Sequence, residues 1–305
     1  MEAMKILIGY DGSPHAEAAL TDLKRAGLPR KVEAKVVTVS EEWMPAPASI
    51  GGVATTFPKF ESEAEADALR LAQSARDVLK TIFPEWHVHA EAATGSPGNI
   101  LTWRAEEWKP DLIVVGSQGR TALGRFFFGS VSQKVLHHAA CSVRIARASQ
   151  KASAAPVRLI VGVDGSPDSD MAVKAVAARH WPKGAEICVV CGIWVPPPVT
   201  SEQMALEVEN WINAEKARTL DAVEAAVKKL QGIGLAASSI IKEEDPKGLL
   251  CAEAENRDAD CIFVGAMGMG RLERALIGSI SSAVAARAHC SVEVVRQPSL
   301  RGAKG

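Results

Sequence analysis

Residues 4–13 read MKILIGYDGS, and residues 157–166 read VRLIVGVDGS, at an offset of 153 positions. Each stretch is a short apolar run that ends in Asp-Gly-Ser, which predicts a strand, a turn and the start of a helix. A second pair follows, because DLIVVGSQG at 111–119 matches DCIFVGAMG at 260–268. The chain therefore contains one domain twice.

The duplication divides the 305 residues into two domains of ordinary size. We expect a first domain over 1–148, a linker over 149–156, a second domain over 157–298 and a tail over 299–305. In both domains apolar strand-like runs alternate with helical patterns. This alternation predicts α/β domains, each a doubly wound parallel sheet with helices on both faces, whose ligands bind at the carboxyl ends of the strands.

Composition limits the classes of partner. The 35 basic and 36 acidic side chains leave a net charge of −1, and aromatic residues make up 5%. We therefore expect no nucleic-acid partner and no membrane-surface role. No apolar run approaches the roughly 20 residues of a membrane span, and the first residues lack a signal peptide, so we expect a soluble, cytoplasmic protein. Cys188 and Cys191 form a C-x-x-C inside a strand pattern, where they would face opposite sides, so we interpret them as core thiols.

Two loops in each half carry the candidate chemistry. The first follows the opening strand, where Tyr10 and Asp11 in one half match Val163 and Asp164 in the other. An acidic residue at the carboxyl end of a strand can accept a hydrogen bond from a ribose hydroxyl or help to hold a metal ion. The same pattern also fits an Asx turn with a helix cap, so both interpretations stay open at this point.

The second loop follows the fourth expected strand and has the spacing G-x2-G-x9-G-S in both halves. Glycines let backbone N–H groups approach an anion, and the last Gly-Ser opens a helix whose N-terminus attracts phosphate. Serines at that helix start add hydroxyl donors, although the glycines also fit simple turns. The loop residues are Gly116, Gly119, Gly129, Ser130 and Ser132 in the first half and Gly265, Gly268, Gly278, Ser279 and Ser281 in the second.

An aspartate after strand one, followed by this glycine pattern after strand four, resembles the universal stress protein family over nearly the whole chain, twice. GSQGRTALGRFFFGSVSQKVL, which begins at Gly116, is a strong match, and GAMGMGRLERALIGSISSAVA, which begins at Gly265, keeps the spacing with altered residues. The resemblance implies a five-stranded parallel sheet of order 3-2-1-4-5 in each domain. That order reverses between strands one and four, whose loops carry the candidate residues.

The resemblance also implies ATP binding, often with a divalent ion such as Mg²⁺ or Mn²⁺. Asp11 would then meet the ribose and lie near a phosphate-bound metal ion, and Val39 would contact the adenine. The phosphates would lie among Gly116, Gly119, Arg120, Gly129, Ser130, Val131 and Ser132, and in the second half among Gly265, Gly268, Gly278, Ser279, Ile280 and Ser281. Met269 replaces Arg120 and Gly192 replaces Val39, so the second site is expected to be weaker.

The leading interpretation is an ATP-binding regulatory protein of the stress response, because neither crevice shows an evident general base or a carboxylate pair for phosphoryl transfer. A slow ATPase or self-phosphorylating enzyme that uses Ser130 or Ser132 is one alternative, and a nucleotide-free interaction module is another. The strands at 142–146 and 291–295 are expected at sheet edges, which tend to be paired. The resemblance implies that they pair the two halves internally, and it leaves a further homodimer open.

Overall fold

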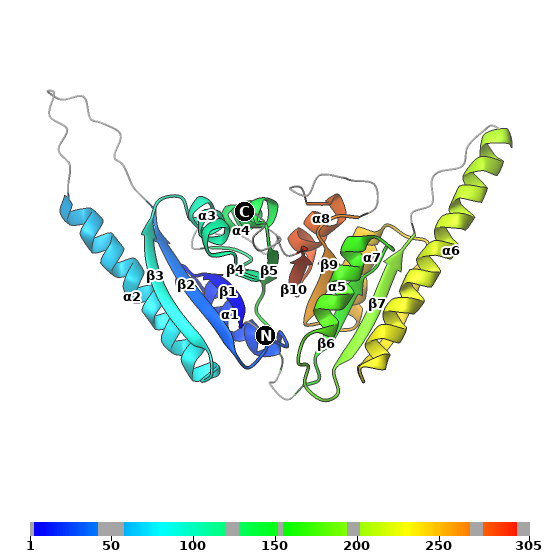
Figure 1. Cartoon of the computed structure of the whole chain (residues 1–305). Helices are drawn as coiled ribbons and strands as arrows, with labels where there is room; N and C mark the ends of the chain where they lie inside the picture. Colours follow the sequence, from blue (N-terminus) through cyan, green and yellow to red (C-terminus); the bar gives the residue numbers. More distant parts are fainter. Residues whose placement is uncertain are drawn as a thin grey trace, which may run out of the picture.

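The computed structural model describes residues 3–41, 58–119, 128–149, 151, 155–193, 202–268 and 277–297. Strands and helices alternate in both halves, and the longest helices lie on the outer sides (Figure 1). The first half contains β1 (Met4–Gly9), α1 (Pro14–Asp22), the 3-10 helix η1 (Leu23–Arg25), β2 (Val32–Ser40), α2 (Pro58–Ile82), β3 (His87–Thr94), α3 (Pro97–Trp108), β4 (Leu112–Gly116), α4 (Ser130–His138) and β5 (Ser142–Ala146). The second half contains β6 (Arg158–Gly162), α5 (Pro167–Ala177), β7 (Glu186–Gly192), α6 (Glu202–Gly232), β8 (Ala236–Lys242), α7 (Pro246–Asn256), β9 (Cys261–Gly265), α8 (Ser279–Arg287) and β10 (Ser291–Val295).

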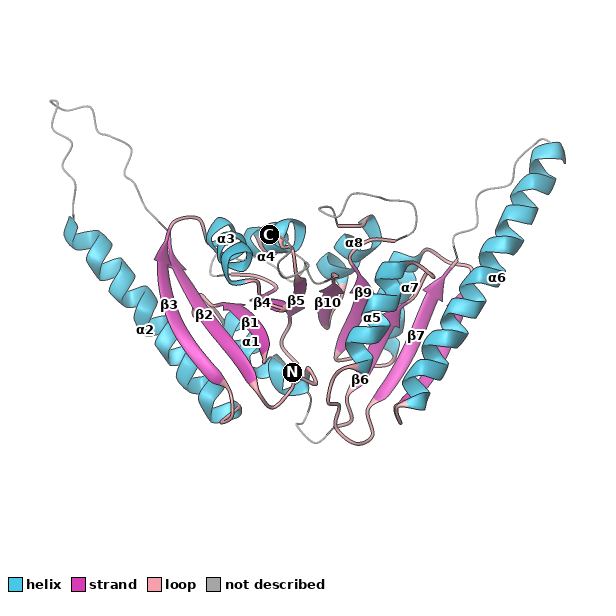
Figure 2. Cartoon of the chain, viewed as in Figure 1, coloured by secondary structure: helices cyan, strands magenta, loops and turns pink. Residues whose placement is uncertain are grey.

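The described strands form one ten-stranded sheet of order β3-β2-β1-β4-β5-β10-β9-β6-β7-β8. Within each half the paired strands run parallel, and the order 3-2-1-4-5 is confirmed in both halves. The two halves join in the middle, where β5 lies beside β10 (Figure 2). These two strands pair antiparallel, and Arg144 lies opposite Glu293. The strands at 142–146 and 291–295, expected to pair the two halves, thus join both five-stranded sheets into one continuous sheet.

Helices α1 and α5 begin where the sequence predicts. The Ser13 hydroxyl accepts a hydrogen bond from the Ala16 N–H at 3.2 Å, and the Ser166 hydroxyl accepts one from the Ser169 N–H at 3.1 Å. A proline follows each serine in the first turn, where its missing N–H costs nothing. These caps fix the direction in which the chain leaves β1 and β6, and so they place the first candidate loop of each half.

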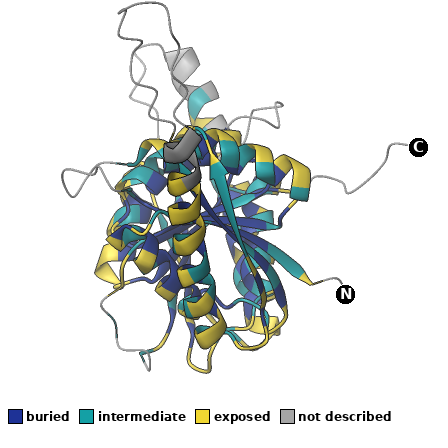
Figure 3. Ribbon diagram, turned by 90° about the vertical axis from the view of Figure 1, so that its left-hand side faces the viewer, coloured by how far each residue is buried: buried dark blue, intermediate teal, exposed yellow. Residues whose placement is uncertain are grey.

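The core lies on both faces of the sheet, and one hydrophobic cluster crosses the junction: it contains Leu7 of the first half and Ile160 of the second. Buried residues concentrate in the strands, while exposed residues lie on the outer sides of the helices (Figure 3). Cys188 and Cys191 are buried free thiols that belong to clusters on opposite faces of β7, which confirms their interpretation as core residues. None of the described helices combines the length and apolar character that a bilayer crossing needs.

Candidate functional site

The larger crevice lies at the carboxyl ends of β1, β2 and β4, where the strand order of the first half reverses. Its cavity of about 840 Å³ falls within the range of about 300–1,000 Å³ that is usual for small-molecule sites. Arg120 lies outside the described residues. The other residues predicted for the first site line this cavity: Tyr10, Asp11, Val39, Gly116, Gly119, Gly129, Ser130, Val131 and Ser132.

The two carboxylate oxygens of Asp11 have different neighbours. Oδ1 accepts a hydrogen bond from the Ser13 N–H at 3.0 Å, which closes an Asx turn before α1. Oδ2 lies 3.0 Å from the position that a Cβ on Gly119 would take. Asp11 therefore closes a turn and lines the cavity beside the glycine loop at the same time.

The glycine loop is closely packed against the rest of the protein. A Cβ on Gly116 would lie 2.8 Å from the His15 carbonyl oxygen, and a Cβ on Gly129 would lie 3.2 Å from the Gln118 Cα. These contacts explain both glycines before any ligand is considered. Gly129 is also the N-cap of α4, and as a glycine it offers that first turn no side-chain cap. The N-cap residue of α4 therefore supplies no side-chain acceptor to the first N–H groups, at an end of the helix that lines the cavity.

Two of the serines predicted as phosphate donors make hydrogen bonds within the protein. The Ser132 hydroxyl donates to the Gly116 carbonyl at 2.6 Å, and the Ser281 hydroxyl donates to the Gly265 carbonyl at 2.6 Å. A hydroxyl has one proton to donate, and both serines are buried. They hold the glycine loops in place, whereas the exposed Ser130 stands at the start of α4 and can face a ligand.

Thr38 is a lining residue that sequence reasoning missed. It lies on β2, it is 2% exposed, and its Oγ1 has no hydrogen-bond partner in the described part of the chain. Because buried hydroxyls are almost always paired, this atom marks a polar position that a ligand in the cavity could satisfy. The available signal was one polar residue in the apolar run AKVVTV, but threonine is ordinary in strands. Other lining residues that the sequence did not single out include Ser40, Glu41, Asp67, Leu71, Pro97, Leu101 and Gln118.

The second crevice occupies the corresponding place in the second half, but its cavity is only about 280 Å³. Asp164 repeats the turn of Asp11, since its Oδ1 accepts a hydrogen bond from the Ser166 N–H at 2.9 Å. Met269 lies outside the described residues. The residues predicted for the second site all line this cavity: Val163, Asp164, Gly265, Gly268, Gly278, Ser279, Ile280 and Ser281.

The loop between β8 and α7 explains the smaller volume. A Cβ on Gly192 would lie 2.8 Å from both the Glu244 carbonyl oxygen and the Pro246 Cα. In the first half the residue that matches Glu244 is Gly95, whose φ of +134° is rarely open to L side chains. The loop of the second half consequently follows a different course, and it closes over the strand position at which Val39 stands in the first half.

One backbone donor of the second glycine loop already has an anionic partner. The Met267 N–H donates to the Asp168 Oδ2 at 2.9 Å. His15 stands at the matching position of the first half, so this carboxylate belongs to the second half alone. A donor near the second cavity is therefore committed within the protein.

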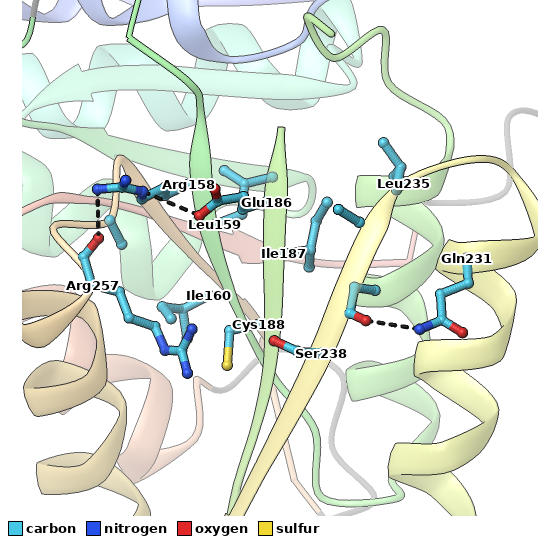
Figure 4. A pocket seen from close by; sticks show the side chains of 13 residues that line it. Arg158, Leu159, Ile160, Glu186, Ile187, Cys188, Gln231, Leu235, Ser238 and Arg257 are labelled. Carbon is cyan, nitrogen blue, oxygen red and sulfur yellow. Dashed lines mark hydrogen bonds and ion pairs between the residues drawn. The ribbon is translucent and has the colours of Figure 1, made fainter. Parts of the chain in front are cut away.

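Another hollow, of about 320 Å³, lies at the amino ends of β6, β7 and β8 (Figure 4). Here Cys188 and Arg257 replace Lys35 and Trp108 of the first half. In the first half the Lys35 ammonium packs over the Trp108 ring at 4.8 Å. Because parallel α/β sheets bind ligands at the carboxyl ends of their strands, we place the candidate sites in the two crevices rather than in this hollow.

Comparison with known proteins agrees with this architecture. The model of the universal stress protein family matches residues 2–147 and again 157–296. A universal stress protein of Mycolicibacterium smegmatis is 27% identical over 303 residues, which cover 95% of this chain and 96% of the relative. One from Mycobacterium tuberculosis is 26% identical over 301 residues, which cover 96% and 97%. The crystal structure of a universal stress protein from Archaeoglobus fulgidus shares the fold, with a TM-score of 0.60, 19% identity and 96% of both chains covered. With both halves matched, the chain belongs to the universal stress protein family.

Proposed function

We propose that the first crevice binds an adenine nucleotide, with ATP as its ligand, and that the chain acts as a regulatory protein in the stress response. One observation carries this proposal: within the described residues, a single cavity combines the start of α4, to which its glycine N-cap offers no side-chain acceptor, the glycine loop and the buried hydroxyl of Thr38, which has no hydrogen-bond partner there. An uncapped helix start favours phosphate oxygens, and an unpaired buried hydroxyl favours a polar ligand group.

The lining suggests how the ligand would lie. Phosphates would face the N–H groups of Ser130, Val131 and Ser132 at the start of α4, since the Gly129 N–H donates to the Ser117 carbonyl at 2.9 Å. The ribose would lie near Asp11, which follows β1. Val39 would supply an apolar contact to the base, and the Thr38 hydroxyl, one residue earlier on β2, would bond to a polar atom of the nucleoside.

A divalent ion would be held mainly by the phosphates. Among the described residues no group of three or more His, Cys, Asp and Glu side chains is arranged to hold a metal ion. Mg²⁺ is often bound through substrate phosphates with one or two carboxylates. Asp11, whose Oδ2 lies beside the glycine loop, is the carboxylate placed to join such an ion.

We propose further that the second crevice binds ATP more weakly. Its cavity is smaller, its loop closes over Gly192, and the Met267 N–H is already bonded to Asp168. The glycine loop and the start of α8 are retained, so the difference lies mainly in the room for the nucleoside.

Calorimetric titration of the whole chain with ATP tests the proposal. Gly129→Asp puts a carboxylate at the start of α4 and should weaken binding at least about tenfold, or about 1.4 kcal/mol. Thr38→Val keeps the side-chain volume and removes the hydroxyl, which should cost about 0.5–1.5 kcal/mol, or about two- to tenfold. Gly278→Asp is the matched control in the second half and should change the main binding event little.

Two results would contradict this assignment. If Gly129→Asp and Thr38→Val both bind ATP like the unaltered chain, the nucleotide does not occupy the first crevice. If Gly278→Asp weakens binding more than Gly129→Asp, the ranking of the two crevices is wrong. Circular dichroism spectra of all variants, compared with the unaltered chain, exclude misfolding as the cause of a loss.

A further inference from the structure

Four charged side chains form a buried row across the junction between β5 and β10. Arg144 Nε donates to Asp22 Oδ2 at 2.6 Å, and Arg144 Nη1 donates to Glu293 Oε2 at 3.2 Å. Glu293 accepts a further bond from Arg179 at its other oxygen. The side chain of Arg144 is 0% exposed and that of Glu293 is 1% exposed. The signs alternate along the row, so every charge lies beside an opposite one.

Opposite neighbours favour the charged form of the two buried arginines. Burial by itself lowers the pKa of Arg144, but Asp22 and Glu293 raise it, and the net pKa lies well above the ordinary value. Burial also lowers the pKa of Arg179, and Glu293 offsets part of that effect. The row therefore depends on residues from both halves, since Asp22 and Arg144 come from the first half and the other two from the second.

The hydrogen bonds on either side of the row follow the repeat. The Arg147 N–H donates to the Ser291 hydroxyl at 3.0 Å, and at the matching positions the Arg296 N–H donates to the Ser142 hydroxyl at 3.1 Å. These bonds would form equally well between two first halves or two second halves. They fix the register of the junction without telling one half from the other.

The centre of the junction breaks the repeat. Arg144 and Glu293 are equivalent residues, 149 positions apart, and the antiparallel register puts them directly opposite each other. Ala175 stands at the position in the second half that matches Asp22 in the first. The strand pair therefore has a basic centre on one side and an acidic centre on the other.

We propose that this row makes the junction selective, so that the β5 edge of a first half accepts the β10 edge of a second half and rejects another first half. Two first halves would bring the Arg144 guanidinium groups face to face, without the Glu293 oxygen that each needs. Two second halves would bring the Glu293 carboxylates face to face. Each buried charge would keep the opposite charge of its own half, Asp22 or Arg179, but it would face a like charge across the strand pair. Like charges that face each other at an interface are unfavourable, so the complementary half is the partner that this surface fits. The inference does not depend on nucleotide binding.

Contacts at the end of the junction add to the same selectivity. Arg179 Nη1 donates to the Ala26 carbonyl at 2.7 Å, and the His180 N–H donates to the Gly27 carbonyl at 2.9 Å. Ala26 of the first half and Arg179 of the second are equivalent residues in the repeat. A small residue of one half therefore meets a large charged residue at the equivalent position of the other half. Two copies of the same half would lose this fit.

Charge reversal in two full-length chains tests the proposal. Arg144→Glu gives a chain with glutamate at both central positions, and Glu293→Arg gives a chain with arginine at both. Neither variant can build the alternating row within itself or with its own copies. Together they can, because the first half of the Glu293→Arg chain and the second half of the Arg144→Glu chain are both unaltered. We expect the two variants, co-expressed with different tags, to co-purify as a one-to-one complex with the mass of two chains.

Matched pairs of chains complete the experiment. Two differently tagged copies of the same variant should co-purify at least tenfold less than the mixed pair. The reversals Lys228→Glu and Glu224→Lys, at an exposed ion pair on α6, should produce no complex when mixed. Co-purification of same-variant copies at the level of the mixed pair would overturn the proposal. So would failure of the mixed pair to associate, whether the chains stay separate or precipitate, since co-expression supplies the natural row during folding.

Discussion

Replacing Gly27 by alanine tests how closely the two halves pack at their junction. Gly27 has a φ of +63°, and a Cβ there would lie 2.7 Å from the ring atom Cε3 of Trp181. The indole has little freedom to move, because its Nε1–H donates to the Val176 carbonyl at 2.8 Å and its ring meets Phe263 edge-on at 6.1 Å. The substitution therefore meets both an unfavourable backbone conformation and a steric clash.

The two costs can be separated with a second glycine. Left-handed backbone costs a non-glycine residue about 1–2 kcal/mol. Gly184 also has a positive φ, +86°, but no atom lies within 4 Å of its added Cβ, so Gly184→Ala should lower the free energy of unfolding by that amount alone. Overpacking against Trp181 adds about 1–3 kcal/mol, so Gly27→Ala should lower it by about 2–5 kcal/mol.

Urea unfolding of both variants, followed by circular dichroism, measures the difference. Trp181→Ala introduced with Gly27→Ala should cost less than the sum of the two single changes, because it removes the atoms that clash. Equal losses of stability for Gly27→Ala and Gly184→Ala would refute the reasoning. The indole would then move aside without cost, and the halves would not be closely packed at Gly27.

Three further outcomes follow from local contacts. Gly192→Val should destabilise the chain by about 1–3 kcal/mol, because the new side chain meets backbone of the next loop, and an unchanged melting temperature would contradict the closed loop. Burial raises the pKa of Asp260, but hydrogen bonds from Arg25 and a backbone N–H lower it below its ordinary value. The stability that Asp260 contributes is thus present above about pH 4 and is lost as the pH falls through the folded pKa. Urea titrations should show that the free energy of unfolding declines over this pH range. Arg25→Gln should make that decline smaller. Burial raises the pKa of Cys141 and Cys290 to about 12, so mass spectrometry should find both alkylated by iodoacetamide only after denaturation, and modification of the native chain would show that they are accessible.

Local signals in the sequence predicted much of the fold. Each half repeats an apolar strand followed by a capped helix, and Ser13 caps α1 as its position before Pro14 indicates. The glycine spacing and Asp11 predicted the part of the first cavity's lining that follows β1 and β4. These features depend on neighbouring residues, which periodicity and turn chemistry describe well.

Features that depend on contacts between residues far apart in the chain were not predicted from the sequence. The hydroxyl of Ser132 bonds to the carbonyl of Gly116, 16 residues earlier, and this internal bond was not predicted. Arg144 and Glu293 appear in their strands as single charges among apolar residues, and their mutual contact spans 149 positions. Likewise the loop closes over Gly192 because Glu244 lacks the positive φ of its equivalent, Gly95. The pattern of apolar residues does not predict this difference in backbone conformation.

The hydrophobic cluster that crosses the junction has a thermodynamic consequence. Leu7 and Val143 of the first half share this cluster with Ile160 and Val292 of the second, so neither half can unfold without exposing apolar surface of the other. Heating should then produce one cooperative transition for the whole chain. A ligand bound in one crevice at a hundred times its dissociation constant would stabilise the entire molecule by about 2.7 kcal/mol. Amide hydrogens in β9, which lies in the second half, would then exchange more slowly when the first crevice is filled. This coupling would need no conformational change.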